Sequence, residues 1–257
     1  MSDRTRTYQG RRWQNGLTEG VEDALTIEHP LTIAINGEVF SLTMQTPGDE
    51  DDLVTGLLFT EGVYKGPYPL DILAQSRNAL GHTDKVELTI SEELLSRSAL
   101  TKRNLLSSSS CGICGTTEMP NVQGKLAFVP QIAEATIQLA MRKMADEQNA
   151  FRTSGGCHGA AAFNPVGEML CLKEDIGRHN AVDKVIGYLV ANDLQKSARL
   201  LTVSGRVSYE IVYKCFAAGI PTLAAVSAPS SLAVDYCKEL GIQLYGFCRD
   251  DRMTQYA

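Results

Sequence analysis

Alternating apolar and polar positions predict β structure near the start of the chain. Residues 24–44 alternate in this way, and Asn36-Gly37 between the two apolar runs is typical of a two-residue hairpin turn. Residues 46–62 open with acidic side chains and then repeat leucines at helical spacing, which predicts a helix. Residues 85–90 alternate again, as a strand does. A small β-rich subdomain is therefore expected within residues 21–100.

The second half of the chain alternates between short apolar runs and helical patterns. Residues 101–129 read as a loop, Pro130 opens a helix to about residue 147, and 158–173 read as two strands around a turn at 164–167. Helices are expected at 180–191, 207–218 and 230–240, and strands at 200–203, 222–226 and 242–245. This succession predicts an α/β fold with a mostly parallel sheet covered by helices. No linker interrupts residues 21–257, so we expect one domain with 130–257 as its main α/β part.

The N-terminal segment 1–20 is rich in arginine and has no apolar run, so it is not a secretory signal. We expect a disordered or loosely docked tail, with a basic arm for a partner as the alternative.

Composition narrows the class of protein. The 257 residues carry a net charge of −6, which argues against nucleic-acid binding through a basic surface. No apolar run approaches the roughly 20 residues that cross a bilayer. A cytoplasmic location is therefore expected, where most cysteines are free thiols. Four of the seven cysteines stand singly among apolar neighbours and are expected in the core: Cys171, Cys215, Cys237 and Cys248.

Polar clusters occur where predicted strands end and helices begin. The first cluster is residues 174–180, with Gly177-Arg178-His179 near its end, and the second is residues 204–208, which begins Ser204-Gly205-Arg206. The third is residues 154–159, and the last is residues 247–252. Each alone is also compatible with a tight turn or a surface ion pair, and no phosphate-binding fingerprint is present. Their joint placement predicts one composite anion pocket at the carboxyl edge of the sheet. Asp175 and Asp183 are candidates to orient His179 or to pair with the arginines.

Cys111 and Cys114 form a CxxC pair inside a run of serines and glycines, SSSSCGICG. A zinc site needs more ligands than one CxxC supplies, although Cys157 and His158 are available to complete it. A thioredoxin-like couple needs the motif at a helix start, which the flanking residues do not favour. A nucleophilic thiol on a loop fits the composition better, and a purely structural role also stays open.

Five blocks carry a resemblance to a known family. SSSSCGICG, SGGCHGAA, KEDIGRHNAVDKVIG, SGRVSYEIVYK and GFCRDDR occur in this order. Together they resemble FdhD, the formate dehydrogenase accessory sulfurtransferase family, from about residue 20 to the C-terminus. Ser154 stands where the family pattern has threonine, and this substitution keeps a hydroxyl.

The resemblance implies a cytidine-deaminase-like α/β fold, although the zinc-deaminase signatures are missing from the sequence. It implies a homodimer that takes persulfide sulfur from a cysteine desulfurase. The sulfur then passes to the molybdenum (or tungsten) bis-guanine-dinucleotide form of the molybdopterin cofactor, which enters formate dehydrogenase. Cys111 is expected to carry the persulfide and Cys114 to resolve, share or shield it. No tightly bound structural metal is expected.

The same resemblance places a cofactor contact near the C-terminus, on Phe247, Cys248, Arg249, Asp250, Asp251 and Arg252. We add the other two clusters to this pocket by inference: Gly177, Arg178, His179, Ser204, Gly205 and Arg206. Two hypotheses compete with the sulfurtransferase. One is a non-catalytic cofactor chaperone with the same pocket, and the other is an interaction module stabilised by zinc.

Overall fold

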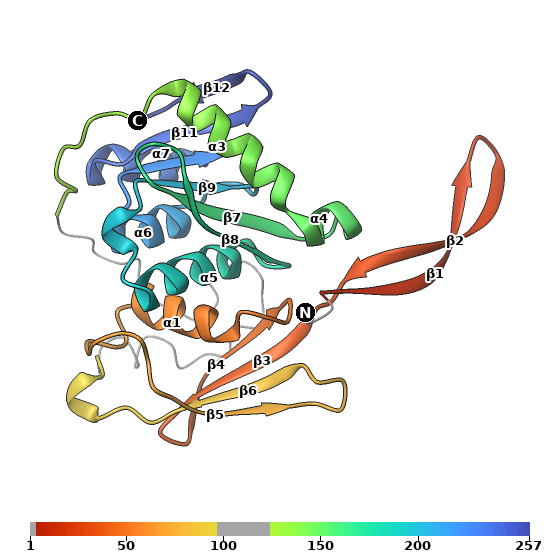
Figure 1. Cartoon of the computed structure of the whole chain (residues 1–257), viewed down its shortest axis with the longest axis horizontal. Helices are drawn as coiled ribbons and strands as arrows, with labels where there is room; N and C mark the ends of the chain where they lie inside the picture. Colours follow the sequence, from red (N-terminus) through yellow and green to blue (C-terminus); the bar gives the residue numbers. More distant parts are fainter. Residues whose placement is uncertain (1–3, 97–123) are drawn as a thin grey trace.

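The computed structural model describes residues 4–96 and 124–257, so Cys111 and Cys114 lie outside the described residues. The described chain forms three sheets and six α-helices, a mixed α/β architecture. Figure 1 shows two stacked layers, each with its own sheet, and a two-stranded ribbon that leaves the body on one side.

Six strands form the main sheet, in the order β12-β11-β10-β9-β7-β8. Their bounds are β7 (His158–Phe163), β8 (Met169–Asp175), β9 (Leu200–Val203), β10 (Thr222–Ala225), β11 (Gln243–Arg249) and β12 (Arg252–Gln255). Only β9, β10 and β11 pair in parallel, whereas β7, β8 and β12 pair antiparallel with their neighbours. The prediction of a mostly parallel sheet is therefore wrong at both margins. There the strands belong to hairpins, and short turns join antiparallel strands.

Helices cover both faces of this sheet. One face packs against α5 (Arg178–Ala191), α6 (Tyr209–Ala217) and α7 (Ser231–Leu240), and the other against α3 (Glu134–Glu147). Successive strand residues point to opposite faces, so Ala160 and Ala162 join the first core while Ala161 and Phe163 join the second. A short helix, α4 (Asn149–Ser154), connects α3 to β7.

The second layer is a four-stranded sheet in the order β4-β3-β6-β5. Its strands are β3 (His29–Ile35), β4 (Glu38–Gln45), β5 (Ile72–Arg77) and β6 (Thr83–Leu88), and α1 (Glu50–Thr60) covers it. The predicted hairpin at Asn36-Gly37 is confirmed. Both residues have positive φ angles, 54° and 84°, as the two-residue turn requires.

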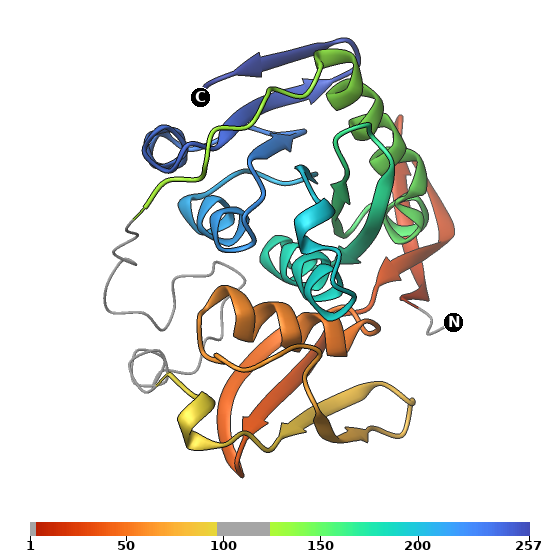
Figure 2. The same cartoon turned by 60° about the vertical axis from the view of Figure 1, so that its left-hand side comes forward.

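The two layers meet where α1 lies against α5, as Figure 2 shows. A Cβ atom at Gly56 would lie 1.9 Å from the carbonyl oxygen of Asp183, and one at Gly187 would lie 1.8 Å from that of Asp52. Glycine is the residue type that permits so close an approach of two helix backbones. These two glycines therefore set the spacing between the layers.

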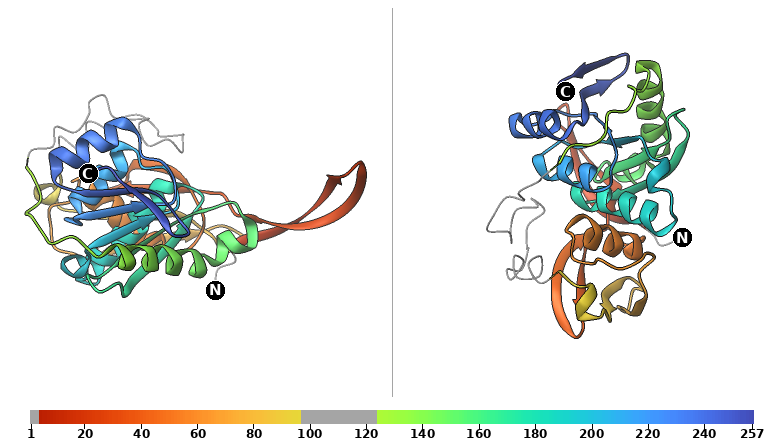
Figure 3. Two further views of the ribbon diagram at one scale, coloured as in Figure 1. Left: turned by 90° about the horizontal axis from the view of Figure 1, so that it is seen from above. Right: turned by 90° about the vertical axis from the view of Figure 1, so that its left-hand side faces the viewer.

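The N-terminal residues form β1 (Thr5–Gln14) and β2 (Leu17–Thr26), an antiparallel ribbon that extends away from the body (Figure 3). The prediction of a disordered or loosely docked tail over residues 1–20 is wrong for these strands. Asn15-Gly16 forms the turn with φ angles of 51° and 77°, the same signal as at 36–37.

The other predicted elements of the second half are present with shifted ends. α3 begins at Glu134 rather than Pro130, because residues before it are extended, and α5 begins at Arg178 rather than 180. The elements β5, β12, α4 and two short 3₁₀ helices at Glu92–Leu94 and Gln195–Ser197 were not predicted.

The five described cysteines are free thiols. Cys215, Cys237 and Cys248 are buried in the core and Cys171 packs partly buried against it, as predicted. Among the described residues, no helix has both the length and the apolar character needed to cross a bilayer.

Candidate functional site

The carboxyl edge of the main sheet brings together two of the predicted clusters. β8 ends there at Asp175 and β9 at Val203, while the antiparallel β7 begins there at His158. The loops that follow β8 and β9 lead directly into α5 and α6. The side chains at these ends therefore face one region, which we call the carboxyl-edge site.

The loop after β9 packs on the start of β7. The Ser204 amide donates to the Gly159 carbonyl at 2.9 Å, and the Gly159 amide donates to Ser204 Oγ at 2.9 Å. Ser204 Oγ also lies 3.5 Å from His158 Nδ1. A Cβ atom on Gly205 would lie 3.2 Å from His158 Nδ1 and 3.4 Å from Arg178 Cβ. Gly205 therefore lets the imidazole and Arg178 meet the loop in direct contact.

The loop after β8 is held by Asp175, which is fully buried. One carboxylate oxygen lies 2.8 Å from Lys184 Nζ and accepts from the Thr46 amide at 3.0 Å. The other oxygen accepts from the Gly177 amide at 2.8 Å and from Asn180 at 3.0 Å. These bonds fix the turn from which α5 starts. They therefore also fix the position of Arg178, the residue that follows Gly177.

Arg178 is the first residue of α5 and lies beside His158 and Gly205. Its Nε atom is buried and has no hydrogen-bond partner among the described residues. Neither α5 nor α6 has a side-chain hydrogen bond from its N-cap residue. At α6 the Glu210 carboxylate accepts from its own backbone amide, so the first amides of α5 are the ones left for another acceptor. A guanidinium beside the open N-terminus of a helix is an arrangement that binds anions such as phosphate.

The charge around His158 is positive. Burial lowers the pKa of His158 below its ordinary value, and the nearby charges of Arg178, His179 and Arg206 lower it further, against an opposing effect of Asp175. His158 is therefore neutral at pH 7. The positive charges of Arg178 and Arg206 beside it can then attract an anionic ligand. Arg206 itself is exposed at the mouth of the loop.

His179 contacts α6 rather than either predicted aspartate. Its Nε2 atom lies 3.4 Å from Ser208 Oγ and 3.7 Å from a Glu210 carboxylate oxygen. Burial alone would raise the pKa of Glu210, but the hydrogen bonds from His179 and Ser208 outweigh it and the pKa is lowered. Both aspartates that we considered as orienting groups or arginine partners pair with lysines instead: Asp175 with Lys184, and Asp183 with Lys214 at 2.8 Å.

The C-terminal cluster divides into two parts. Phe247 and Arg249 lie at the same edge, because the Phe247 amide donates to the Ser227 carbonyl and Arg249 Nε to the Val226 carbonyl, just after β10. β10 separates them from β9, so they stand about 10 Å from the Ser204 loop. The phenyl ring of Phe247 is 42% exposed.

The remaining residues of that cluster point elsewhere. Cys248 is buried against α3 on the opposite face of the sheet. Asp250 and Asp251 form the turn into β12, which Arg252 begins, and Asp251 lies 3.5 Å from Arg142 of α3. The structure does not bring these four side chains together with Arg178, and their assignment as cofactor contacts stays a prediction.

The third cluster, residues 154–159, has two different roles. Gly155, with a φ of 66°, ends α4, and Ser154 Oγ lies 2.6 Å from Thr26 Oγ1 on β2. Burial and Glu174 raise the pKa of the Cys157 thiol to about 12, so Cys157 stays protonated. His158 and Gly159, at the end of the cluster, are the residues that reach the carboxyl-edge site.

The sequence includes His158 in the predicted pocket only as part of the glycine-rich cluster 154–159, and Ser208 only as the end of the cluster 204–208. The place of His158 follows from the antiparallel pairing of β7 with β9. Glu210 was not predicted for the pocket, although it lies at the predicted start of a helix after a strand, a signal that could have included it.

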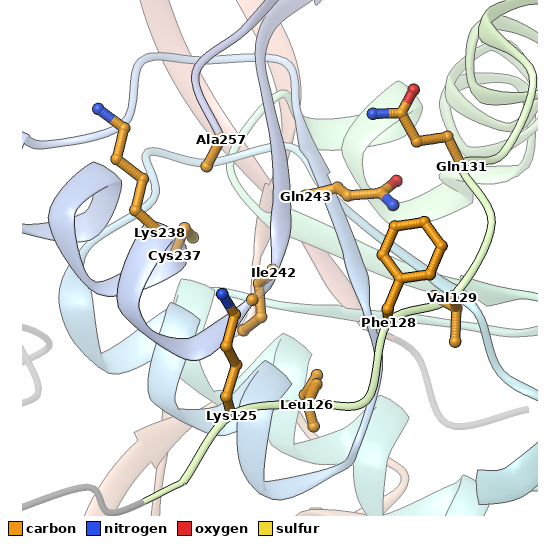
Figure 4. Close-up of a pocket in the computed structure, with 11 residues that line it drawn as sticks. Lys125, Leu126, Phe128, Val129, Gln131, Cys237, Lys238, Ile242, Gln243 and Ala257 are labelled. Atoms are coloured by element: carbon orange, nitrogen blue, oxygen red, sulfur yellow. The ribbon is translucent and has the colours of Figure 1, made fainter.

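A cavity of about 460 Å³ lies at the opposite end of the strands and is shown in Figure 4. Its walls are mostly apolar and come from the segment 125–131, the end of α7 and the start of β11. Lys125 and Lys238 stand at its rim. This cavity is separate from the carboxyl-edge site.

Comparison with known proteins gives a consistent result. The model of the FdhD/NarQ family matches residues 26–257. A protein of Mycolicibacterium paratuberculosis named sulfur carrier protein FdhD is 38% identical over 244 residues, covering 91% of this chain and 90% of its own length. Proteins of the same name from Streptomyces coelicolor and Saccharolobus solfataricus are 37% and 36% identical over 96% and 91% of this chain, and over 91% and 89% of their own lengths.

A solved structure shares the fold. The crystal structure of a protein from Desulfotalea psychrophila, named as a formate dehydrogenase accessory protein, superposes with a TM-score of 0.75. The match covers 98% of this chain and 97% of the other at 22% sequence identity.

Proposed function

Because the chain belongs to the FdhD/NarQ family, we propose that it is a sulfurtransferase that loads a cofactor for formate dehydrogenase. It takes persulfide sulfur from a cysteine desulfurase. It passes that sulfur to the molybdenum (or tungsten) bis-guanine-dinucleotide cofactor, which is its bound substrate. The name of its relatives, sulfur carrier protein, supports the first half of this proposal. We also propose that the main layer, which contains the six-stranded sheet, has a cytidine-deaminase-like fold.

The accepting group is the thiolate of Cys111. It attacks the terminal sulfur of the desulfurase persulfide, a new S–S bond forms on Cys111, and the desulfurase cysteine leaves as a thiolate. The sulfur keeps its oxidation state, so this step needs no external oxidant or reductant. The five described cysteines do not compete for the sulfur, since burial raises the pKa of each of them.

Delivery as sulfide needs two electrons, which the thiol of Cys114, the second cysteine of the CxxC motif, supplies. Attack of the Cys114 thiolate on the inner sulfur of the Cys111 persulfide forms a Cys111–Cys114 disulfide and releases HS⁻. A dithiol reductant of the cell then restores both thiols. The two-residue spacing of the motif is the spacing that such a disulfide uses.

The observation that carries the proposal is the carboxyl-edge site. Three features support a site for a phosphate or diphosphate group: Arg178 with its unpartnered Nε, the open N-terminus of α5, and the cationic surroundings of His158. A guanine dinucleotide carries such groups. The exposed ring of Phe247, about 10 Å along the same edge, offers a surface on which a base can stack.

Intact-mass spectrometry tests the transfer. After incubation with a cysteine desulfurase and cysteine, we expect a species heavier by about 32 Da, the mass of one sulfur, on the wild-type chain. The adduct should be lost in Cys111→Ala and kept in Cys171→Ala, a matched thiol that packs against the core. If an active desulfurase does not load the wild-type chain with sulfur, the proposal that this chain is a sulfurtransferase is refuted.

A non-catalytic cofactor chaperone is the alternative, favoured by the same anion site. It predicts that GDP binds and that no sulfur adduct forms. Loading of Cys111 therefore separates the two functions, and binding of GDP alone supports only the chaperone. A zinc-stabilised interaction module predicts stoichiometric zinc in the purified protein, which is lost in both Cys111→Ser and Cys114→Ser.

A further inference from the structure

The cavity of about 460 Å³ at the other end of the strands has walls that are held together by backbone contacts. The extended segment 125–131 forms one wall, and its Leu126 amide donates to the Leu240 carbonyl at 2.9 Å. Gly241 ends α7 with a φ of 74°, and a Cβ atom there would lie 2.9 Å from the Lys125 side chain. The segment is therefore packed directly onto the end of α7.

The interior of the cavity is apolar. Cys237 and Ile242 belong to the core of the main layer and are 0% and 2% exposed, and Leu126 packs against the same core. Phe128 adds a phenyl ring that is 92% exposed. Mostly apolar cavities of about 300–1,000 Å³ are typical of sites for small molecules. The size and lining of this cavity therefore suit a small ligand with an apolar body.

The charged side chains that line the cavity are both lysines. Lys125 comes from the extended segment and Lys238 from the last turn of α7. Neither ammonium group has an ion pair or a hydrogen bond with another described residue. Because the whole chain carries a net charge of −6, two such lysines form a local positive patch that favours an anion.

The two kinds of side chain stand on different sides of the cavity. Figure 4 shows Lys125 and Lys238 on one side and Phe128 on the other, with Ile242 between them. We propose that the cavity binds a free carboxylate with an apolar tail, the chemistry of a medium-chain fatty acid. The carboxylate lies between the two lysines, and the tail runs over Ile242 toward Phe128.

This site is distinct from the carboxyl-edge site, and α7 separates the two. The helix begins beside the loop after β9, where the Ser230 amide donates to the Val207 carbonyl at 2.9 Å. It ends at Leu240 beside the cavity, and its ten residues span about 15 Å. A fatty acid and a guanine nucleotide can therefore bind to one chain together, and the proposal does not depend on sulfur transfer.

Isothermal titration calorimetry on the whole chain tests the ligand class. We expect one decanoate per chain, bound about three- to tenfold more tightly than octanoate because two further methylene groups leave water. 1-Octanol has the tail of octanoate without its charge and should bind at least tenfold more weakly. No binding of decanoate at about 1 mM, or equal affinities for octanoate and 1-octanol, would overturn the proposal.

Substitution of the lysines tests the position of the carboxylate. The double variant Lys125→Gln, Lys238→Gln should bind decanoate at least tenfold more weakly. Lys196→Gln removes an exposed lysine outside the cavity and should leave the affinity unchanged. All three positions are exposed, so both variants should keep the wild-type circular dichroism spectrum and melting temperature. A double variant that binds decanoate as tightly as the wild type would contradict the proposed site.

Photolabelling locates the tail. A fatty acid with a diazirine in its chain should label residues 125–131 or 237–243, and decanoate should suppress this labelling while GDP leaves it unchanged. Labelling confined to the ribbon of β1 and β2, where Trp13 and Leu17 are exposed, would refute the cavity as the binding site. Displacement of the label by GDP would refute a site distinct from the carboxyl edge. None of these results depends on whether Cys111 accepts sulfur.

Discussion

Replacing Asp175 with alanine removes one partner of a fully buried ion pair and should destabilise the protein by about 3–5 kcal/mol. Asp175 and Lys184 both have side chains with 0% exposure, and their charged atoms lie 2.8 Å apart. The substitution leaves the Lys184 ammonium buried with only neutral acceptors, the Thr46 carbonyl at 2.8 Å and the Gln45 amide at 3.5 Å. It also removes the acceptor that holds the Gly177 amide.

Thermal and urea unfolding measure this loss. At the usual 2–4 °C for each kcal/mol in a chain of this size, the melting temperature should fall by roughly 6–20 °C. The control is Asp251→Ala, because the Asp251 side chain is 93% exposed and its pair with Arg142 is long. That variant should change stability by less than about 0.5 kcal/mol. A loss below about 1 kcal/mol for Asp175→Ala would show that the pair does not anchor the loop.

Three further substitutions or treatments follow from the structure. Gly187→Ala drives a methyl group into the backbone of α1 and should cost about 3 kcal/mol in urea unfolding, so an unchanged midpoint would contradict the close helix contact. Arg178→Gln should weaken GDP binding about 10–100-fold by calorimetry, whereas Arg152→Gln, exposed on α4, should not; equal affinities would remove Arg178 from the anion site. Burial and Glu174 raise the pKa of Cys157 to about 12, so iodoacetamide at about pH 8 should spare it in the native protein, and rapid alkylation there would refute its assignment as a buried thiol.

Local patterns were sufficient to predict most elements and the location of the candidate site. Short apolar runs and helical spacing predict the alternation of strands and helices from residue 200 to 245, and the structure contains these strands and helices. Placing Arg178 and Ser204 at one edge required only that β8 and β9 end on the same side. The structure places both residues at this edge, and their role in binding stays a prediction.

Tertiary contacts account for what the sequence did not predict. The sequence predicts a tail over residues 1–20 because this segment is rich in arginine and has no apolar run, although Asn15-Gly16 is the same turn signal as Asn36-Gly37. Which lysine each aspartate selects depends on how α5 meets α1 and α6, which no local pattern encodes. The place of His158 in the site depends on the antiparallel pairing of β7 with β9, which are far apart in the sequence and which no local pattern pairs.

Sulfur transfer from a loaded chain to its cofactor tests the central claim most directly, because it requires the thiol and the carboxyl-edge site together. The chain is loaded with ³⁵S through a desulfurase and then mixed with the bis-guanine-dinucleotide cofactor. We expect the label to move to the cofactor from the wild-type chain. Arg178→Gln should load equally with ³⁵S but transfer it at least tenfold more slowly at limiting cofactor. Equal transfer by both chains would contradict the account, since delivery would then not pass through the carboxyl-edge site.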